Sequence, residues 1–326
     1  MRRCLKGERL PGLFLVLKSG LFTTVQDLGR SGCLRYGVPL SGAMDQFSLV
    51  AANLLVGNTP GDACLEMTLI CPELQVLSET QIAVTGAVCS PRINGEIVPM
   101  WRTLEAKKGD MVSFGSMQNG CRAYLSVRGG INVPLVLGSR STYSRGGLGG
   151  LDGRPLRNGD MIESFSAQLL GVGFSMPKEL VPQFADKVEA RAVLGPQADM
   201  FTDAGVKTFF SESFKVTSEA DRMGYRLDGP LIEHKGSADI VSDALLPGAV
   251  QVPKNGRPIL VMQDAQTTGG YPKIAVVISS DLSVLAQAKP GCSIEFSKVP
   301  LSEAQERSRE FLKLLKSLSN MLVANQ

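Results

Sequence analysis

Apolar residues along the chain recur mostly at the spacing of short strands. The run at 13–17 predicts a first strand, and similar runs follow at 81–85, 110–114 and 122–127. Turn pairs such as Asn94-Gly95 separate these runs, as is usual between antiparallel strands. The N-terminal half therefore predicts a sandwich or barrel of short strands.

Two segments show the spacing of three and four residues that is typical of helices. The first starts at the signal 41–45 and stops at Gly57, and its apolar positions are Phe47, Val50, Ala51, Leu54 and Leu55. The second covers 302–322, and its apolar stripe consists of Phe311, Leu314, Leu315, Leu318 and Leu322. We predict two amphipathic helices and expect the second to pack onto its own domain.

A second block of strands opens near Ala192, after a segment at 177–186 that is interpreted as a linker. Similar turn-into-strand patterns occur at Gly109, Gly159 and Gly291, and either an internal duplication or ordinary hairpin chemistry explains them. We predict a mainly β protein with a few helices. Its expected parts are residues 13–185, with a glycine-rich loop at 138–153, then residues 190–300, and a C-terminal helix at 301–326.

Charge and cysteine content narrow the classes of function. The net charge is +3, and the basic residues are interspersed with carboxylates, which excludes the basic surface of a nucleic-acid-binding protein. The seven cysteines are odd in number and contain no Cys-x-x-Cys pair, so neither a disulfide framework nor a zinc site is expected. No apolar run reaches the roughly 20 residues of a membrane helix, and no signal peptide is evident. We expect a cytoplasmic protein without membrane or metal.

His234 is the only histidine, which removes most catalytic triads and histidine-rich metal sites. It lies in a polar stretch and is expected at the surface. The chain has no Walker P-loop, and the glycine run at 146–150 does not lead from a strand into a helix. Nucleotide binding by this chain alone is therefore not expected.

Four polar clusters remain as candidates for chemistry. The loop 263–273 combines amide groups, hydroxyls, glycines and a lysine, which suit a carboxylate, carbamate or phosphate. The loop 140–145 carries two arginines and Tyr143, an arrangement that can hold a carboxylate between two charges. The motifs 26–30 and 221–226 each place an aspartate near an arginine. A solvated hairpin loop, solvated arginines or loop-fixing ion pairs would give the same patterns.

Taken in order, these motifs resemble the carboxyltransferase subdomain family once called allophanate hydrolase subunit 2. The matching runs lie at 24–30, 37–45, 52–58, 136–143, 195–199, 218–227 and 266–273. The resemblance implies two cyclophilin-like β-barrel subdomains in one chain, and such a duplication would explain the repeated turns.

The resemblance also implies a function: a subunit of an ATP-dependent 5-oxoprolinase, a hydrolase that opens the lactam of 5-oxoproline to glutamate. The implied partners are a subunit-B-like protein, similar to allophanate hydrolase subunit 1, and a subunit-A-like protein. ATP would be bound with these partners, and the chain is expected to be inactive alone. One alternative is a urea carboxylase-like carboxyltransferase component, with biotin on a separate chain because no Met-Lys-Met motif occurs here. Another is a regulatory protein that antagonises a kinase inhibitor.

For a lactam substrate, we expect the catalytic groups to be Asp264, Lys273 and Gln263, with a proton passing to the leaving nitrogen. The expected substrate-binding residues are Arg140, Tyr143, Gln266, Thr267, Gly270 and Tyr271. Supporting residues, including ion pairs within each motif, are expected to be Gln26, Asp27, Arg30, Asp221 and Arg222. Arg140 and Lys273 should then face one cleft.

Overall fold

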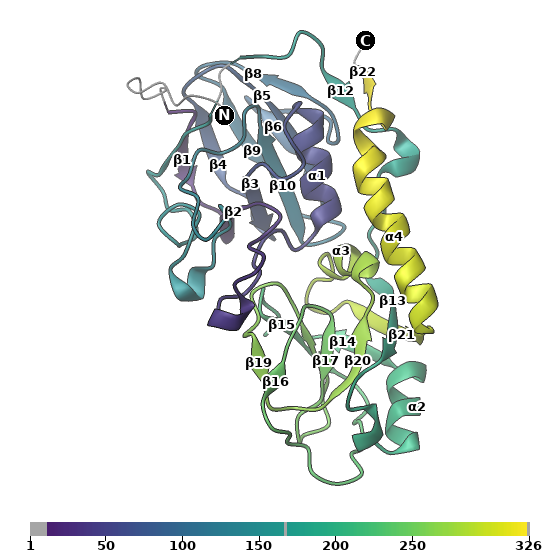
Figure 1. The fold of residues 1–326 in the computed structure, drawn as a ribbon. Coiled ribbons are helices and arrows are strands. Elements are labelled where there is room, and N and C mark those ends of the chain that lie inside the picture. Colours follow the sequence, from purple (N-terminus) through teal and green to yellow (C-terminus); the bar gives the residue numbers. More distant parts are fainter. Residues whose placement is uncertain (1–11, 166–167, 325–326) are drawn as a thin grey trace.

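Two β-rich units stack end to end, and a long helix runs along both of them (Figure 1). This computed structural model describes residues 12–165 and 168–324. Cys4 and the basic residues at 1–9 lie outside this range. The predicted class, mainly β with a few helices, is confirmed.

The N-terminal unit contains two antiparallel sheets that enclose one apolar core. One sheet has the order β11 (Met161–Ile162), β1 (Phe14–Lys18), β4 (Glu73–Val76), β9 (Met111–Phe114), β6 (Pro91–Ile93) and β7 (Glu96–Ile97). The other has the order β2 (Phe22–Gln26), β3 (Cys64–Thr68), β10 (Arg122–Val127), β5 (Thr80–Gly86) and β8 (Leu104–Ala106). Val16, Leu65 and Leu125 are fully buried between the sheets. The strands predicted in this half are therefore confirmed.

Helix α1 (Gln46–Leu55) covers the outer face of β5 and β10. Asp45 caps its N-terminus by accepting hydrogen bonds from Ser48 N at 3.0 Å and Ser48 Oγ at 2.6 Å. Eight of its ten residues are buried, including the polar Ser48 and Asn53. The helix was predicted to be amphipathic, but a second layer of structure covers its outer side as well.

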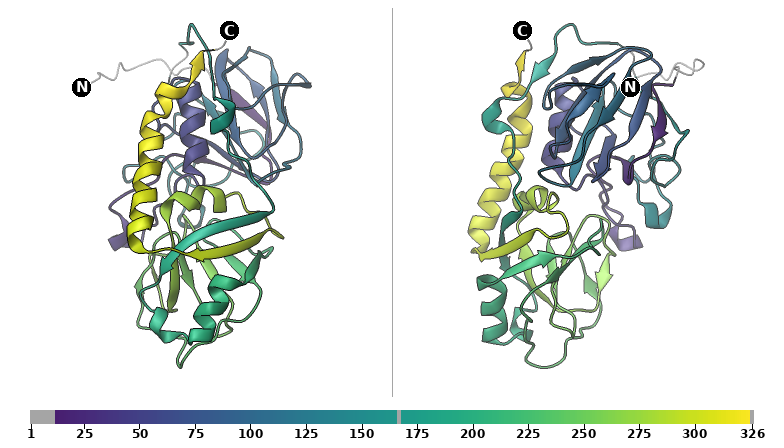
Figure 2. Two further views of the ribbon diagram at one scale, coloured as in Figure 1. Left: turned by 90° about the vertical axis from the view of Figure 1, so that its right-hand side faces the viewer. Right: turned by 180° about the vertical axis from the view of Figure 1, so that it is seen from behind.

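That second layer is α4 (Leu301–Ser317), which continues into a 3-10 turn at Leu318–Met321. Figure 2 shows the helix running alongside the N-terminal unit. Its apolar stripe forms one cluster with Phe47 and Trp101 of that unit. The expectation that this helix packs onto its own domain holds for its N-terminal half, which contacts the second unit and where Ser308 Oγ lies 2.9 Å from Ser279 Oγ, whereas the apolar stripe of its C-terminal half lies on the first unit. It follows the last strand of the second unit but returns along the first, because α1 offers an apolar face there.

The C-terminal unit is a closed barrel. Its strand order is β13 (Lys187–Leu194), β20 (Lys273–Val277), β17 (Ala249–Gln251), β18 (Ile259–Val261), β15 (Gly224–Asp228), β14 (Ser213–Val216) and β21 (Ser293–Lys298). Neighbouring strands pair antiparallel except β13 and β21, which are parallel. Phe209 of α2 (Asp203–Ser211) stacks on Phe296 with ring centroids 4.5 Å apart and closes the barrel core.

The remaining elements are short. Helix α3 (Leu282–Leu285) lies on the side of the barrel that meets the first unit. Two strand pairs connect distant segments: β12 (Phe174–Ser175) with β22 (Val323–Ala324), and β16 (Asp243–Ala244) with β19 (Thr268–Gly269). His234, expected at the surface, is half-buried, and its ring lies 4.7 Å from that of Phe201.

An ion pair next to the glycine-rich loop predicts a dependence of stability on pH. Arg154 donates to both oxygens of Asp160, at 2.7 and 2.9 Å, and these bonds lower the pKa of Asp160. A carboxyl group whose pKa is lower in the folded state stabilises the fold at pH values above its unfolded-state pKa of about 4. This stabilisation is lost as the pH falls through the folded-state pKa. We expect Asp160→Asn to lower the free energy of unfolding at pH 7 by about 0.5–1 kcal/mol. Urea unfolding at pH 7 and at acid pH should show the difference shrinking below about pH 4; an unchanged difference would contradict the assignment.

Candidate functional site

The junction between the two units is held by charged side chains that are buried. Glu66 of β3 accepts hydrogen bonds from Met44 N at 2.9 Å, Tyr124 Oη at 2.8 Å and Arg222 Nη1 of the second unit. Arg222 also donates to Asp264, through Nε at 2.8 Å and Nη2 at 3.0 Å. Burial alone would lower the pKa of Arg222, but the attraction of Asp264 and Glu66 holds it above its usual value. Arg222 is thus fixed as a cation between two carboxylates.

A second set of contacts crosses the junction beside the first. Arg122 of β10 donates to Tyr225 Oη at 2.6 Å and to the carbonyl of Ala286. Gln287 accepts from Arg122 N at 3.0 Å and donates to Asp45 at 2.8 Å, so it links the barrel to the cap of α1. Because these polar groups are buried and paired, the junction fixes the two units relative to each other.

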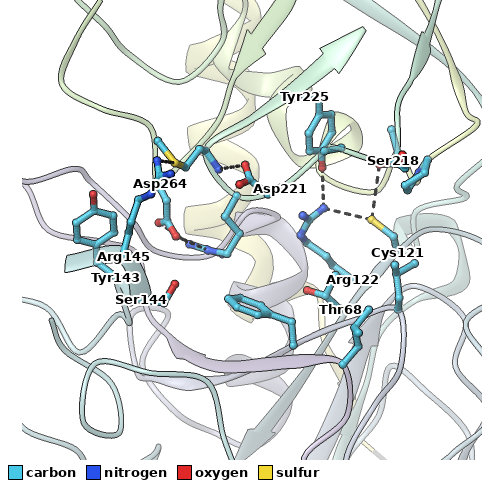
Figure 3. Close-up of a pocket in the computed structure, with 18 residues that line it drawn as sticks. Thr68, Cys121, Arg122, Tyr143, Ser144, Arg145, Ser218, Asp221, Tyr225 and Asp264 are labelled. Atoms are coloured by element: carbon cyan, nitrogen blue, oxygen red, sulfur yellow. Dashed lines mark hydrogen bonds and ion pairs between the residues drawn. The ribbon is translucent and has the colours of Figure 1, made fainter. Parts of the chain in front are cut away.

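A cavity of about 480 Å³ opens beside these two networks (Figure 3). This volume lies within the range of about 300–1,000 Å³ that is usual for small-molecule sites. The first unit contributes Leu21, Phe22, Thr68, Leu69, Cys121 and Arg122, together with Tyr143, Ser144 and Arg145 of the glycine-rich loop. The second unit contributes Ser218, Ala220, Asp221, Arg222, Met223, Tyr225, Asp264, Ala288 and Pro290. The cavity therefore depends on both units.

Two buried donors in the wall of this cavity are unpaired. Thr68 Oγ1 and Arg122 Nε have no hydrogen-bond partner within the described part of the chain. The nearest carboxylate to Arg122 Nε is Glu66, at 4.0 Å. An unsatisfied buried donor costs about 1–3 kcal/mol, so a ligand oxygen that reaches these two atoms, which have almost no exposed surface in this structure, would be stabilised. At the rim, Arg145 Nη1 lies 2.6 Å from Met223 Sδ and supplies a further positive charge.

Several residues predicted from the sequence do meet in this cavity. Tyr143, Asp221, Arg222 and Asp264 all line it. Tyr143 and Asp264 come from different units and lie on the same side of the cavity in Figure 3. Burial raises the pKa of Tyr225, a cavity residue that the sequence did not single out. The region between the two units is therefore the candidate site.

The ion pairs expected within each motif do not form. Asp221 accepts from the backbone nitrogens of Met223 and Gly224 and closes a tight turn, while Arg222 pairs with Asp264 and Glu66. The expectation was wrong because Asp221 caps the turn that follows it, while Arg222 reaches carboxylates that are distant in the sequence.

The same holds at the other motif. Asp27 accepts from Ser139 Oγ at 2.6 Å, from Ser141 Oγ and from Arg140 N at 2.6 Å. Arg30 makes no ion pair among the described residues and donates to the carbonyl of Ser141 at 2.6 Å.

Arg140 and Lys273 do not line the cavity, and the expectation that they face one cleft is wrong. Lys273 Nζ donates to Asp243 at 2.5 Å and to the carbonyl of Ala244 at 3.1 Å. Arg140 Nε donates to the carbonyl of Val133 at 3.1 Å, and its guanidinium lies 4.7 Å from the ring centre of Phe165. Each side chain is occupied within its own unit.

The rest of the loop 263–273 is held by contacts to residues 240–251, and its strand β19 pairs with β16. The carbonyls of Thr267, Gly270 and Tyr271 accept from Leu245 N, Ile240 N and Gln251 Nε2, and the side chain of Gln266 is exposed. Gln263 is buried at the junction, where its carbonyl accepts from Ser41 N at 3.0 Å. Of the residues in this loop that the sequence singled out, Asp264 alone lines the cavity.

Glu66, Thr68 and Arg122 are site residues that the sequence reasoning missed. Glu66 and Arg122 belong to strands in which almost every residue is buried, β3 with the sequence Cys-Leu-Glu-Met-Thr and β10 with Arg-Ala-Tyr-Leu-Ser-Val. A charged residue in such a strand is seldom buried without a partner of opposite charge. The charge within each apolar segment was therefore the feature of the sequence that could have indicated a buried ion pair.

Within residues 12–165 and 168–324, the requirements of a metal cluster and of a membrane-spanning helix are not met. No group of three His, Cys, Asp or Glu side chains in this part is placed to bind a metal, and its six cysteines are free. None of its helices has the length and apolar character needed to cross a membrane.

Residues 36–298 match the family described as carboxyltransferase domain, subdomain A and B. The 5-oxoprolinase C subunit of Escherichia coli (strain K12) is 40% identical over 311 residues, covering 94% of this chain and 98% of that protein. The urea amidolyase of Saccharomyces cerevisiae is 36% identical over 312 residues, which are 89% of this chain and 17% of that protein. The crystal structure of the K. lactis urea amidolyase matches with a TM-score of 0.89 at 32% identity and covers 97% of this chain and 21% of that one.

Proposed function

The chain belongs to the carboxyltransferase domain family, subdomains A and B, and from this we propose that it is the substrate-binding subunit of an ATP-dependent 5-oxoprolinase. It aligns with 98% of the E. coli 5-oxoprolinase C subunit but with 17% of the yeast urea amidolyase, so it spans about a sixth of the latter's length. The structural observation that supports the proposal is the cavity between the units, where Thr68 Oγ1 and Arg122 Nε are unpaired among the described residues.

The cavity suits a small lactam acid. The ring carbonyl or carboxylate of 5-oxoproline would accept from Arg122 Nε and Thr68 Oγ1, and its lactam N–H would donate to Asp264. Leu21, Phe22 and Leu69 form an apolar wall against which the ring methylenes can pack. Polarisation of the amide carbonyl by two fixed donors is the way in which proteins favour attack on amides.

We assign ATP to the partner subunits, because this chain carries no nucleotide-binding motif. The proposed partners are a subunit-B-like and a subunit-A-like protein, and we expect the isolated chain to be inactive. The complex is proposed to work in the cytoplasm.

Reconstitution tests this function. The three subunits, purified separately and mixed, should co-elute and release glutamate from 5-oxoproline when ATP is present. Omitting this chain should abolish the release. A complex that forms but turns over urea and not 5-oxoproline would overturn the proposal.

A urea carboxylase-like role is the second candidate, because the chain matches the K. lactis urea amidolyase with a TM-score of 0.89. The cavity also fits the ureido ring of biotin, whose carbonyl oxygen would accept from Arg122 and Thr68 while Leu69 and Phe22 contact the ring. Biotin, carried on a separate chain, would supply the carboxyl group. A bicarbonate and biotin requirement for turnover would identify this role.

Thr68→Val tests the substrate contact with little change in shape. Losing one donor to the substrate should raise KM for 5-oxoproline about tenfold in the complex, since such a bond is worth about 1–1.5 kcal/mol. Steady-state kinetics measures this change. Thr68→Ser keeps the hydroxyl and should restore KM, whereas a Thr68→Val enzyme with an unchanged KM would exclude the contact.

A further inference from the structure

Tyr225 belongs to the core of the barrel, and it also lines the cavity between the two units. It lies on β15, where its backbone pairs with Leu260 of β18, and its side chain is buried. The hydroxyl donates to the carbonyl of Ala286 at 3.3 Å. Because a closely packed core holds a side chain in one rotamer, the barrel determines where this hydroxyl lies.

The second unit holds one side of the Arg122 guanidinium, although Arg122 itself belongs to the first unit. Nη1 donates to Tyr225 Oη at 2.6 Å and to the carbonyl of Ala286. The same nitrogen lies 3.2 Å from Cys121 Sγ, and Figure 3 shows its contacts with Tyr225 and Cys121. A guanidinium is planar and rigid, so acceptors that hold one nitrogen fix the direction of its other N–H bonds.

The other two nitrogens of this guanidinium are free. Nε has no hydrogen-bond partner in the described part of the chain, and Nη2 donates to no group there either. Glu66, whose nearest oxygen is 4.0 Å from Nε, already accepts from three other donors. Nε and Nη2 are the pair with which arginine binds planar oxygen groups. Since Arg122 lines the cavity, this pair is available to a ligand bound there.

We propose that Tyr225 is a positioning residue: with the carbonyl of Ala286, its hydroxyl holds Arg122 so that Nε and Nη2 are directed at the substrate oxygens. The first unit thus supplies the donors, and the second unit sets their direction. This inference rests on the proposed function, in which Arg122 binds the lactam acid. Burial raises the pKa of Tyr225, so the phenol stays neutral and keeps both its proton for Ala286 and a lone pair for Arg122.

A double-mutant cycle in the reconstituted complex separates positioning from a general effect on the junction. Tyr225→Phe should lower kcat/KM for 5-oxoproline about tenfold, the effect of losing one hydrogen bond. In a complex that carries Arg122→Met, the same change should alter kcat/KM less than about twofold, because no guanidinium remains to be positioned. A tenfold loss in both backgrounds would show that Tyr225 acts on the junction as a whole. That result, or no loss in the wild-type background, would overturn the proposal.

Tyr36→Phe is the control for the loss of a phenol oxygen. Tyr36 is exposed, its ring contacts Arg35, and it does not line the cavity. Its replacement should leave kcat/KM unchanged. A loss as large as that of Tyr225→Phe would speak against a specific role of the Tyr225 hydroxyl.

A crystal structure of the Tyr225→Phe chain, without substrate or partner subunits, tests the positioning without any assay of activity. We expect the barrel strands to stay in place and the guanidinium of Arg122 to turn from its wild-type orientation; an unturned guanidinium would exclude the role of Tyr225. If the wild-type complex releases no glutamate from 5-oxoproline, the proposed function fails, and this structure still decides the positioning.

If Tyr225→Phe does not fold, the wild-type chain crystallised with 5-oxoproline takes its place. Arg122 Nη1 should then keep Tyr225 Oη as its partner while the ligand contacts Nε or Nη2. A ligand oxygen that replaces Tyr225 Oη on Nη1 would contradict the proposal.

Discussion

Arg222→Ala should lower the free energy of unfolding by about 3–5 kcal/mol, because it leaves Glu66 and Asp264 as uncompensated charges in the junction. Both carboxylates are buried and face Arg222. The two units would then lose their fixed arrangement, and activity of the complex should fall with it. Chemical unfolding of the purified chain measures the first effect, and turnover in the reconstituted complex measures the second.

The control for this variant lies on β15, the strand that follows Arg222 in the chain. Arg226 of β15 pairs with Glu219, but both side chains are more than half exposed. Exposed pairs contribute little, so Arg226→Ala should change the free energy of unfolding by less than about 1 kcal/mol. Equal losses from Arg222→Ala and Arg226→Ala would show that the buried network does not hold the junction.

Arg122→Met should lower kcat/KM for 5-oxoproline about 100-fold, because the variant keeps much of the volume of the side chain but removes the charged donor from the cavity. The loss of stability should be smaller than for Arg222→Ala. Glu66 retains its bond from Arg222, and Tyr225 Oη can still donate to the carbonyl of Ala286, at 3.3 Å. Steady-state kinetics in the complex, together with chemical unfolding, separates the two effects.

Arg92→Met is the control variant for the Arg122→Met measurement. Arg92 lies on β6 of the same unit, donates to the carbonyl of Gly95 and does not line the cavity. Its replacement should leave kcat/KM unchanged. An Arg122→Met complex with the turnover of Arg92→Met would remove Arg122 from the substrate site.

The strands were predictable because the short apolar runs that mark them are local. The segments 122–127 and 274–278 are both rich in apolar residues, and they form β10 inside its sheet and most of β20 in the closed barrel. The surface against which α4 packs was not predictable in the same way. An apolar stripe shows which face of a helix is buried, but the surface that covers it is set by the tertiary fold.

The candidate site was predicted in part. Asp264, Tyr143 and Arg222 were singled out from their motifs and do line one cavity. Lys273 was placed there wrongly, because the pairing of β16 with β19 brings Asp243 to it from 30 residues away. Glu66 was missed for a similar reason, since its partner Arg222 is 156 residues distant in the chain. Such long-range pairs leave no local pattern in a single sequence.

The central claim is that the cavity between the two units binds the substrate. A crystal structure of the reconstituted complex, grown with 5-oxoproline and without ATP, tests this claim most directly. We predict that the lactam lies between Thr68 and Arg122 of the first unit and Asp264 of the second, with an oxygen within hydrogen-bond distance of Arg122 Nε. Density for 5-oxoproline at another place in the complex, with this cavity holding only solvent, would contradict the account.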